Sequence, residues 1–280
     1  MRKFAKTKLS LGPVAENRPH EFAMRHAFAV YESHAIYTFV PKNASTTMRY
    51  SIARNNRFID ETTDVDWHHS NNLTFCASQE FAVTADYAFV ILRCPFRRLA
   101  SAYLDKVVTA NNVVRSIYPK KLRKIQLRIM ERMMYHGLSF RDFVERIARL
   151  DRLETNEHWR PQADFLVFDE YDDYFSVENF SRAEAVLARK IGFTTYDTRD
   201  AVRHDTTKLE KVSGQFSDTP AGVLFKMRKA GQVPSYESLY DRDLIARVAE
   251  IYADDVALYA DKCGSQGLLF PDVVAAARRI

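Results

Sequence analysis

Two strand, loop and helix patterns near the start of the chain constrain the fold more than any other feature. Residues 35–40 form a short apolar run, and a helical pattern begins just beyond it at Ser45 or Thr46. Residues 87–92 form a second apolar run, and Pro95 suits the first turn of a second helix. Two successive units of this kind imply parallel strands with helices packed on the sheet. The sequence therefore predicts an α/β protein.

Size, charge and cysteine content limit the class of protein further. The chain has 280 residues, 46% of them hydrophobic, and a net charge of +5. A chain of this size buries a full core, and the positive charge suits an anionic partner such as a nucleotide, a polyanionic glycan or nucleic acid. The 3 cysteines match neither a disulfide framework nor a zinc site. No apolar segment suits a signal peptide or a membrane-spanning helix, so we expect a cytoplasmic protein with no transmembrane segment.

The domain organisation expected from the sequence is simple. We predict one domain over residues 1–280, with a core over about 35–260 and an N-terminal extension over 1–30. Residues 194–238 are richer in Gly, Pro, Ser, Thr and Asp and show weak periodicity, which predicts a surface loop region able to act as a lid.

Further elements are predicted outside the two units. The stretches Ser139–Asp142 and Ser181–Glu184 match the capping box that starts a helix. The apolar residues 165–168 predict another strand, and an apolar stripe over 244–259 predicts one long closing helix.

The segment of residues 39–49, FVPKNASTTMR, points most clearly to chemistry. A strand that turns sharply into a helix presents open backbone N–H groups and the positive end of the helix dipole, which together attract an anion. Lys42 and the hydroxyls of Ser45, Thr46 and Thr47 would surround the same point. The segment has no glycine and its lysine precedes the hydroxyls, which disfavours Walker-type NTP hydrolysis. The simpler alternative is a helix cap beside a solvated lysine.

A second segment follows the second predicted strand. Arg93 stands where that strand ends, at the edge where open α/β sheets bind ligands. Ser101 lies beside the apolar stripe of the next helix, so its hydroxyl could join the Arg93 guanidinium on one phosphate. Taken alone, an arginine such as Arg93 is more often a surface ion-pair partner.

Together the two segments resemble the donor-binding motifs of the sulfotransferases that use 3′-phosphoadenosine 5′-phosphosulfate (PAPS), in family 2, the branch with the carbohydrate O-sulfotransferases. Pro41–Thr46 is similar to the 5′-phosphosulfate motif P-K-x-x-[CS]-T, and Arg93–Tyr103 to the 3′-phosphate motif R-x-P-x-x-R-L-x-S-x-Y. Residues 158–162 are similar to H-W-x-P-Q, and residues 171–180 and 252–259 resemble later stretches of the same group.

The departures from the family pattern are few. An acidic residue often stands where Cys94 does, and many animal members carry an N-terminal membrane anchor that is not seen here. We expect the first departure to leave PAPS binding intact.

The resemblance implies a fold, a donor and a set of site residues. The fold is a P-loop-like three-layer arrangement, with a central, mainly parallel sheet flanked by helices. The donor is PAPS, the product adenosine 3′,5′-bisphosphate, and no metal is required. Lys42 would offset charge on the bridging oxygen of the leaving group. The residues implied in donor binding are Pro41, Lys42, Asn43, Ala44, Ser45, Thr46, Thr47, Arg93 and Ser101.

A histidine is the base that the resemblance implies for the acceptor hydroxyl. His69 lies where related enzymes carry an active-site histidine in a K-H-S-T-A-like run, so it is the first choice. His158 is the competitor, and it would otherwise line the acceptor site with His68 and Arg160. The plain alternatives are that His68 and His69 are surface loop residues and that His158 packs with Trp159.

Several other interpretations stay open. A metal site at the histidines is unattractive because adjacent histidines rarely bind one ion well. The basic residues 120–128 are either a solvated helix face or a track for an acidic glycan. A kinase would need a glycine-rich loop and carboxylates for Mg²⁺. A nucleic-acid-binding protein is disfavoured because the aromatic residues fall on apolar stripes, where core packing explains them. A degenerate member that binds without catalysis is disfavoured because Lys42, Arg93 and Ser101 are all retained. The resemblance implies a carbohydrate or glycolipid acceptor, and we expect no nucleic acid as a partner. The sequence does not define the acceptor or the oligomeric state.

Overall fold

The computed structural model describes residues 1–7, 13, 16–71, 73–118, 135–152, 155–198 and 209–272, without the side chains of His68 and His69. The described chain divides into two compact units. Unit 1 comprises the described residues within 1–93, 161–203 and 261–263, and unit 2 those within 94–160, 204–260 and 264–280. The single domain expected over residues 1–280 stays a prediction.

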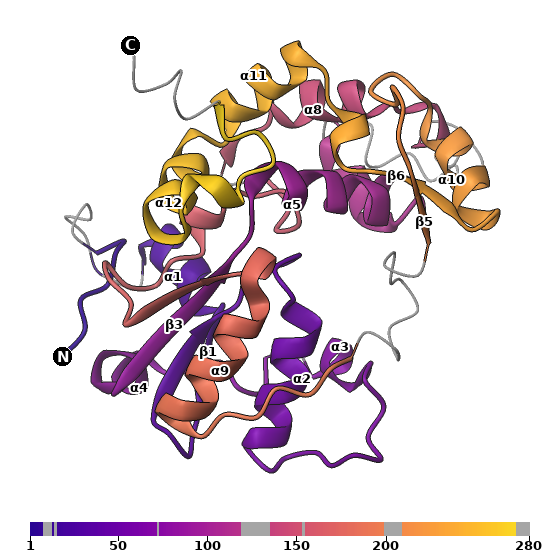
Figure 1. Cartoon of the computed structure of the whole chain (residues 1–280). Coiled ribbons are helices and arrows are strands. Elements are labelled where there is room, and N and C mark those ends of the chain that lie inside the picture. The colour runs from indigo at the N-terminus through magenta and orange to yellow at the C-terminus, as the bar shows by residue number, and fades with distance from the viewer. Residues whose placement is uncertain are drawn as a thin grey trace. The chain divides into compact units, whose positions relative to one another are not determined.

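A four-stranded sheet forms the centre of unit 1 (Figure 1). Its strands are β1 (Ala27–Val30), β2 (Ala35–Thr38), β3 (Tyr87–Leu92) and β4 (Asp173–Ser176), in the spatial order β1, β2, β3, β4. The β1 strand pairs antiparallel with β2, whereas β2 with β3 and β3 with β4 pair in parallel. The prediction of an α/β fold with a mainly parallel sheet flanked by helices is therefore confirmed.

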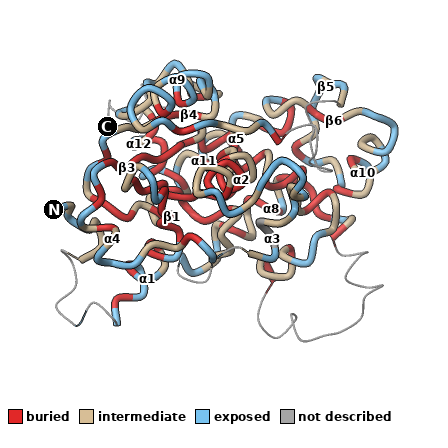
Figure 2. The backbone as a smooth tube through the Cα atoms, turned by 90° about the horizontal axis from the view of Figure 1, so that it is seen from below, coloured by how far each residue is buried: buried red, intermediate tan, exposed pale blue. Residues whose placement is uncertain are grey.

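Alternate residues of the strands build the core of unit 1, as the period of two in a strand requires. One face of the sheet packs against α2 (Ser45–Asn55) and α9 (Phe180–Ile191). Figure 2 shows the backbone of these strands as mostly buried. The cluster includes Phe28, Tyr37, Phe39, Met48, Ile52, Phe89, Ile91, Phe175, Ala183 and Leu187.

The first thirty residues, expected as an extension, take part in unit 1. They supply α1 (Arg18–Met24) and the edge strand β1. The arm before α1 is held by backbone hydrogen bonds, among them Arg2 N to Val83 O at 2.8 Å and Ala5 N to Val167 O at 2.9 Å.

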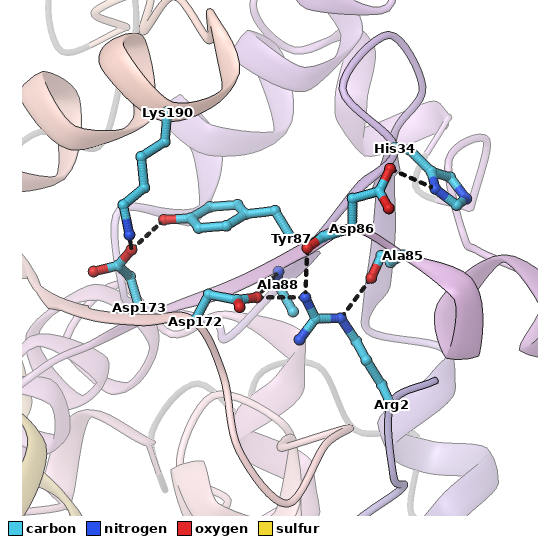
Figure 3. A network of polar contacts seen from close by, with 9 residues as sticks. All are labelled: Arg2, His34, Ala85, Asp86, Tyr87, Ala88, Asp172, Asp173 and Lys190. Carbon is cyan, nitrogen blue, oxygen red and sulfur yellow. Dashed lines mark hydrogen bonds and ion pairs between the residues drawn. The ribbon is translucent and has the colours of Figure 1, made fainter.

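The Arg2 guanidinium completes this attachment at the amino end of β3 (Figure 3). Its Nε donates to Ala85 O at 2.8 Å, its Nη2 donates to Asp86 O at 2.9 Å, and the group also pairs with the Asp172 carboxylate. In the same view, Asp173 accepts from Tyr87 Oη and Lys190 Nζ, both at 2.5 Å. A network of charged hydrogen bonds therefore fastens the N-terminal arm, β3 and β4 together.

Two shorter helices complete unit 1, α3 (Trp67–Ser70) and α4 (Gln79–Thr84). Unit 2 is mainly helical. Its helices are α5 (Pro95–Ala102), a π-helical continuation Tyr103–Val107, α8 (Phe140–Ile147), α10 (Ala221–Lys229), α11 (Arg242–Ile251) and α12 (Ala253–Cys263), the last three residues of which group with unit 1.

Unit 2 also has a parallel pair of short strands and several short turns of 3-10 helix. The strands are β5 (Glu210–Val212) and β6 (Gln232–Pro234). The predicted apolar stripe of α5 is buried throughout, and Ser139 starts α8 with the predicted capping box. The 3-10 turns of the two units are Asn112–Ile117, Gln162–Asp164, Val177–Asn179, Glu237–Leu239 and Ser265–Gly267.

The prediction of a strand over residues 165–168 is wrong. Phe165 follows a 3-10 turn and packs its ring against His26 at 4.7 Å between centroids, and Phe168 forms only an isolated bridge with Phe4. These residues are buried by ring contacts without a ladder of hydrogen bonds, so an apolar run did not identify a strand. The strand that pairs with β3 is the more polar Asp173–Ser176.

Two helix predictions also need correction. Helix α9 begins at Phe180 with Asn179 before it and without a side-chain cap, so the predicted capping box at Ser181 is absent. The predicted single closing helix is two helices, because the backbone of Tyr252 (φ −112°, ψ 32°) leaves the helical region between α11 and α12. That break lets the Tyr252 hydroxyl donate to Trp159 O at 2.5 Å.

The region predicted as a loop, residues 194–238, contains regular structure in the part that the structure describes. Strands β5 and β6 and helix α10 all fall within it. Each strand has only three residues, and β5 is mostly exposed, which explains why their sequence shows little hydrophobic periodicity.

None of the helices described is both long and apolar enough to span a bilayer. All three cysteines are among the described residues, and none of them forms a disulfide.

Candidate functional site

The loop between β2 and α2 has an unusual backbone for a segment without glycine. Lys42 (φ 72°) and Ala44 (φ 54°) both lie in the left-handed region, which costs a residue with a side chain about 1–2 kcal/mol. The loop is held by hydrogen bonds before and between these residues, from Phe39 N to His26 O at 2.8 Å and from Asn43 N to Val40 O at 3.2 Å. Strain of this kind persists only where the surroundings fix the conformation, and it is common at ligand sites.

The helix start expected at Ser45 or Thr46 is at Ser45. Ala44 occupies the cap position and has no side chain that accepts a hydrogen bond. The N–H groups of the first turn of α2 therefore remain open to an anion, together with the positive end of the helix dipole. The hydroxyl of Thr47 already makes a hydrogen bond, because its Oγ1 lies 2.9 Å from Oγ1 of the buried Thr198.

Arg93 lies directly beyond the carboxyl end of β3 and is partly buried. Its Nη1 donates to the carbonyl oxygen of Lys42 at 2.8 Å. Residues from the two motifs singled out in the sequence are therefore in contact within unit 1. A lysine and an arginine at the carboxyl ends of neighbouring parallel strands form a positively charged sheet edge.

Gln162 joins the same two segments, although its sequence motif did not predict a role for it. Its Oε1 accepts from Arg93 N at 3.0 Å and from Asn43 Nδ2 at 2.6 Å, and its Nε2 donates to Arg93 O at 2.8 Å. Asn43 Nδ2 also donates to Ile91 O at 2.9 Å. The signal was present in the sequence, because Gln162 closes the H-W-x-P-Q stretch, but a motif alone does not tell what its glutamine contacts.

The remaining predicted residues with described side chains lie in unit 2. Ser101 is partly buried on α5, and Arg160 is 5% exposed. The neighbour of Ser101 on that helix, Arg98, is 2% exposed and donates to Arg160 O at 2.7 Å and Glu157 O at 3.0 Å. The second arginine of the 3′-phosphate motif is therefore buried, and it holds the segment that carries His158.

His158 has a defined tautomer. Its Nδ1 lies 2.8 Å from Asn156 Oδ1, which also accepts from the His158 backbone N–H at 3.0 Å. Because an amide oxygen only accepts, Nδ1 carries the proton in the neutral ring and Nε2 carries the lone pair. The hydrogen bond to Asn156 therefore fixes the orientation of the ring.

The histidine pair His68 and His69 and the basic stretch 120–128 lie partly or wholly outside the described structure. The backbone of His68 and His69 belongs to α3, but their side chains are outside the described structure. The basic stretch 120–128 also lies outside the described residues. Among the residues that are described, no group of three or more His, Cys, Asp or Glu side chains is arranged to hold a metal ion.

Comparison with known proteins defines the class. The model of the sulfotransferase family matches residues 25–260, which is most of the chain and includes both donor-motif segments. No curated protein and no solved structure gives a match. The chain belongs to the sulfotransferase family, and the resemblance to its family 2 is confirmed. Membership supports transfer of a sulfuryl group as the general reaction.

Proposed function

We propose that this chain transfers a sulfuryl group from PAPS to a hydroxyl of a carbohydrate acceptor. The observation that carries the proposal is the contact between the two donor motifs, in which Arg93 Nη1 holds the carbonyl oxygen of Lys42. An ordered lysine loop, an open helix start and an arginine at one sheet edge suit a ligand with two separated anionic groups. The adenosine 3′,5′-bisphosphate portion of PAPS is such a ligand.

The proposed donor site assigns one anionic group to each segment. The loop and the first turn of α2 would bind the 5′-phosphosulfate through backbone N–H groups, Lys42 and the hydroxyls. Arg93 would bind the 3′-phosphate with Ser101. The loop residues in this proposal are Pro41, Lys42, Asn43, Ala44, Ser45, Thr46 and Thr47.

The proposed reaction is an in-line displacement at sulfur. The acceptor oxygen forms a bond to sulfur while the bond from sulfur to the bridging oxygen breaks, and adenosine 3′,5′-bisphosphate leaves. Negative charge grows on the bridging oxygen, and the Lys42 ammonium offsets it. The acceptor hydroxyl proton passes to a histidine. No metal is needed, because positioning and cationic side chains supply the stabilisation.

The identity of the base remains a choice between two histidines. His69 is favoured by its place in the sequence, and His158 is supported by the hydrogen bond from its Nδ1 to Asn156, which leaves Nε2 able to accept a proton. The residue that is not the base would contact the acceptor with His68 and Arg160.

Transfer of labelled sulfur tests the function directly. PAPS carrying labelled sulfur is incubated with a panel of oligosaccharides, polysaccharides and glycolipids in the presence of a chelator, beside ATP labelled in its γ-phosphate. We expect label from PAPS on one class of glycan and none with Lys42→Ala. Transfer from ATP, with none from PAPS, would support the kinase alternative instead.

A further inference from the structure

The side-chain amide of Gln162 hydrogen-bonds to the backbone of Arg93 just beyond the end of the sheet, where a neighbouring strand would otherwise pair. The pairing of β3 with β4 stops at Leu92 and Ser176, so the next residue, Arg93, has no ladder partner from β4. The Gln162 amide, on a side chain that is 1% exposed, accepts from the N–H of Arg93 and donates to its carbonyl oxygen. One amide thus satisfies both backbone groups of Arg93, as a neighbouring strand would.

The same amide oxygen reaches the lysine loop. Gln162 Oε1 accepts from Asn43 Nδ2 at 2.6 Å, and Asn43, which is fully buried, also donates to Ile91 O. Asn43 lies between the two left-handed residues of the loop, Lys42 and Ala44. Gln162 is therefore bonded both to the backbone that presents Arg93 and to the centre of the loop that presents Lys42.

We propose that Gln162 is a positioning residue that sets the separation of the two anion-binding segments before the donor arrives. The inference rests on the proposed donor, PAPS, and deepens it by naming what enforces recognition of a nucleotide with two separated anions. A ligand with both phosphates gains from a fixed spacing of Lys42 and Arg93, whereas a ligand with one phosphate engages one segment and gains little. Gln162 does not touch the ligand in this role.

The chemistry of the amide explains why glutamine suits the position. Methionine has a similar length and shape but keeps neither hydrogen bond to Arg93. Glutamate keeps the two acceptor bonds but cannot donate to Arg93 O, and it would bring a negative charge to an anion site. Asparagine has the same amide donor and acceptor, but its side chain is shorter by one methylene, so the amide lies farther from Arg93.

A titration of the full chain tests the proposal with a control for lost stability. The affinities for adenosine 3′,5′-bisphosphate and for AMP are measured calorimetrically for wild type, Gln162→Met and Gln162→Asn. The matched control is Asn55→Leu, because Asn55 makes the same kind of two-sided contact with the backbone of Thr194, at 2.8 and 2.9 Å, at the far end of α2. Thermal unfolding of each variant is followed in parallel.

We expect Gln162→Met to lower the affinity for the bisphosphate by about tenfold or more and the affinity for AMP much less, so that the ratio between them falls. In an Arg93→Ala background the effect of Gln162→Met should largely disappear, which a merely structural role would not produce. Asn55→Leu should lower the unfolding temperature and leave the ratio unchanged.

The outcomes separate this inference from the proposed function. Wild type that binds the bisphosphate no better than AMP would overturn the proposed donor itself. Wild type that is selective, with Gln162→Met equally selective, would overturn the positioning role alone. Where Gln162→Met does not fold, the ratio measured for Gln162→Asn decides the matter, because retained selectivity with a shortened amide contradicts the role.

Discussion

At the scale of single residues, the lysine loop shows how a segment without glycine can form the turn that we propose as an anion site. Lys42 and Ala44 take left-handed backbone conformations that glycine would adopt without cost. The strain is borne because Asn43, Arg93 and Gln162 hold the loop by hydrogen bonds. The geometry of the loop is thus fixed by contacts with distant segments and not by local backbone preference.

Relief of this strain should be measurable. We expect Ala44→Gly to raise the free energy of unfolding by up to about 1 kcal/mol, since the gain at a left-handed position exceeds the entropy that glycine adds to the unfolded chain. Urea unfolding measures the change. The control is Ala188→Gly on the exposed side of α9, which should lower stability by about 1 kcal/mol. Equal losses at the two positions would show that Ala44 is not strained.

A substitution beside His158 distinguishes the two candidate bases. Asn156→Asp would place a carboxylate against Nδ1 in place of the amide oxygen, which stabilises the protonated imidazolium. If His158 is the base, the acid limb of the pH profile of sulfuryl transfer should move to higher pH by about one unit. An unchanged acid limb, together with lost activity in His69→Gln, would assign the base role to His69.

At the scale of elements, the sequence predicted the two strand, loop and helix segments that carry the donor motifs better than it predicted the rest. Strand β3 and the starts of α2 and α5 lie where their apolar runs, hydroxyls and proline indicated. Strand β4 could not be predicted in this way, because Asp173–Ser176 is stabilised by pairing with β3 and by charged contacts that no local pattern reveals. Gln162 was missed as a site element for the same reason, since its partners are 69 and 119 residues away in sequence.

The N-terminal arm should contribute to the stability of unit 1 through Arg2. We expect Arg2→Ala to cost about 1–2 kcal/mol, because its partly buried guanidinium bonds two carbonyl oxygens and the Asp172 carboxylate. Arg57→Ala removes a mostly exposed pair with Glu32 and should cost less than about 0.5 kcal/mol. Urea unfolding of both variants checks this difference, and similar small losses would mean that the arm adds little.

At the scale of the whole molecule, low pH should reduce the stability of both units, because it protonates carboxylates that are hydrogen-bonded as anions in the folded state. Burial opposes ionisation of Asp173, but hydrogen bonds from Lys190 and Tyr87 lower its pKa overall. In unit 2 the hydrogen bond from Arg141 lowers the pKa of Asp218 below its ordinary value of 3.8. Because the folded pKa lies below the unfolded one, this stability is present above the unfolded value and is lost as the pH falls through the folded one.

The unit 2 contribution can be isolated with Arg141, which bonds Asp218 at 2.6 and 3.1 Å and also pairs with Asp241. Urea unfolding from about pH 6 down to about pH 3 should show Arg141→Ala less stable than wild type at the upper end, with the two curves converging in acid. Arg152→Ala removes an exposed pair with Asp254 and should give a nearly parallel curve. A constant gap for Arg141→Ala would contradict the assigned linkage.

Calorimetric titration with adenosine 3′,5′-bisphosphate, without metal and with ATP and AMP as controls, tests the central claim most directly. The contact between Arg93 and the lysine loop predicts selective binding of the bisphosphate that Arg93→Ala weakens strongly and Lys42→Ala weakens as well. Binding that equals that of AMP, or that requires Mg²⁺, would contradict a PAPS site and favour a kinase or nucleic-acid function.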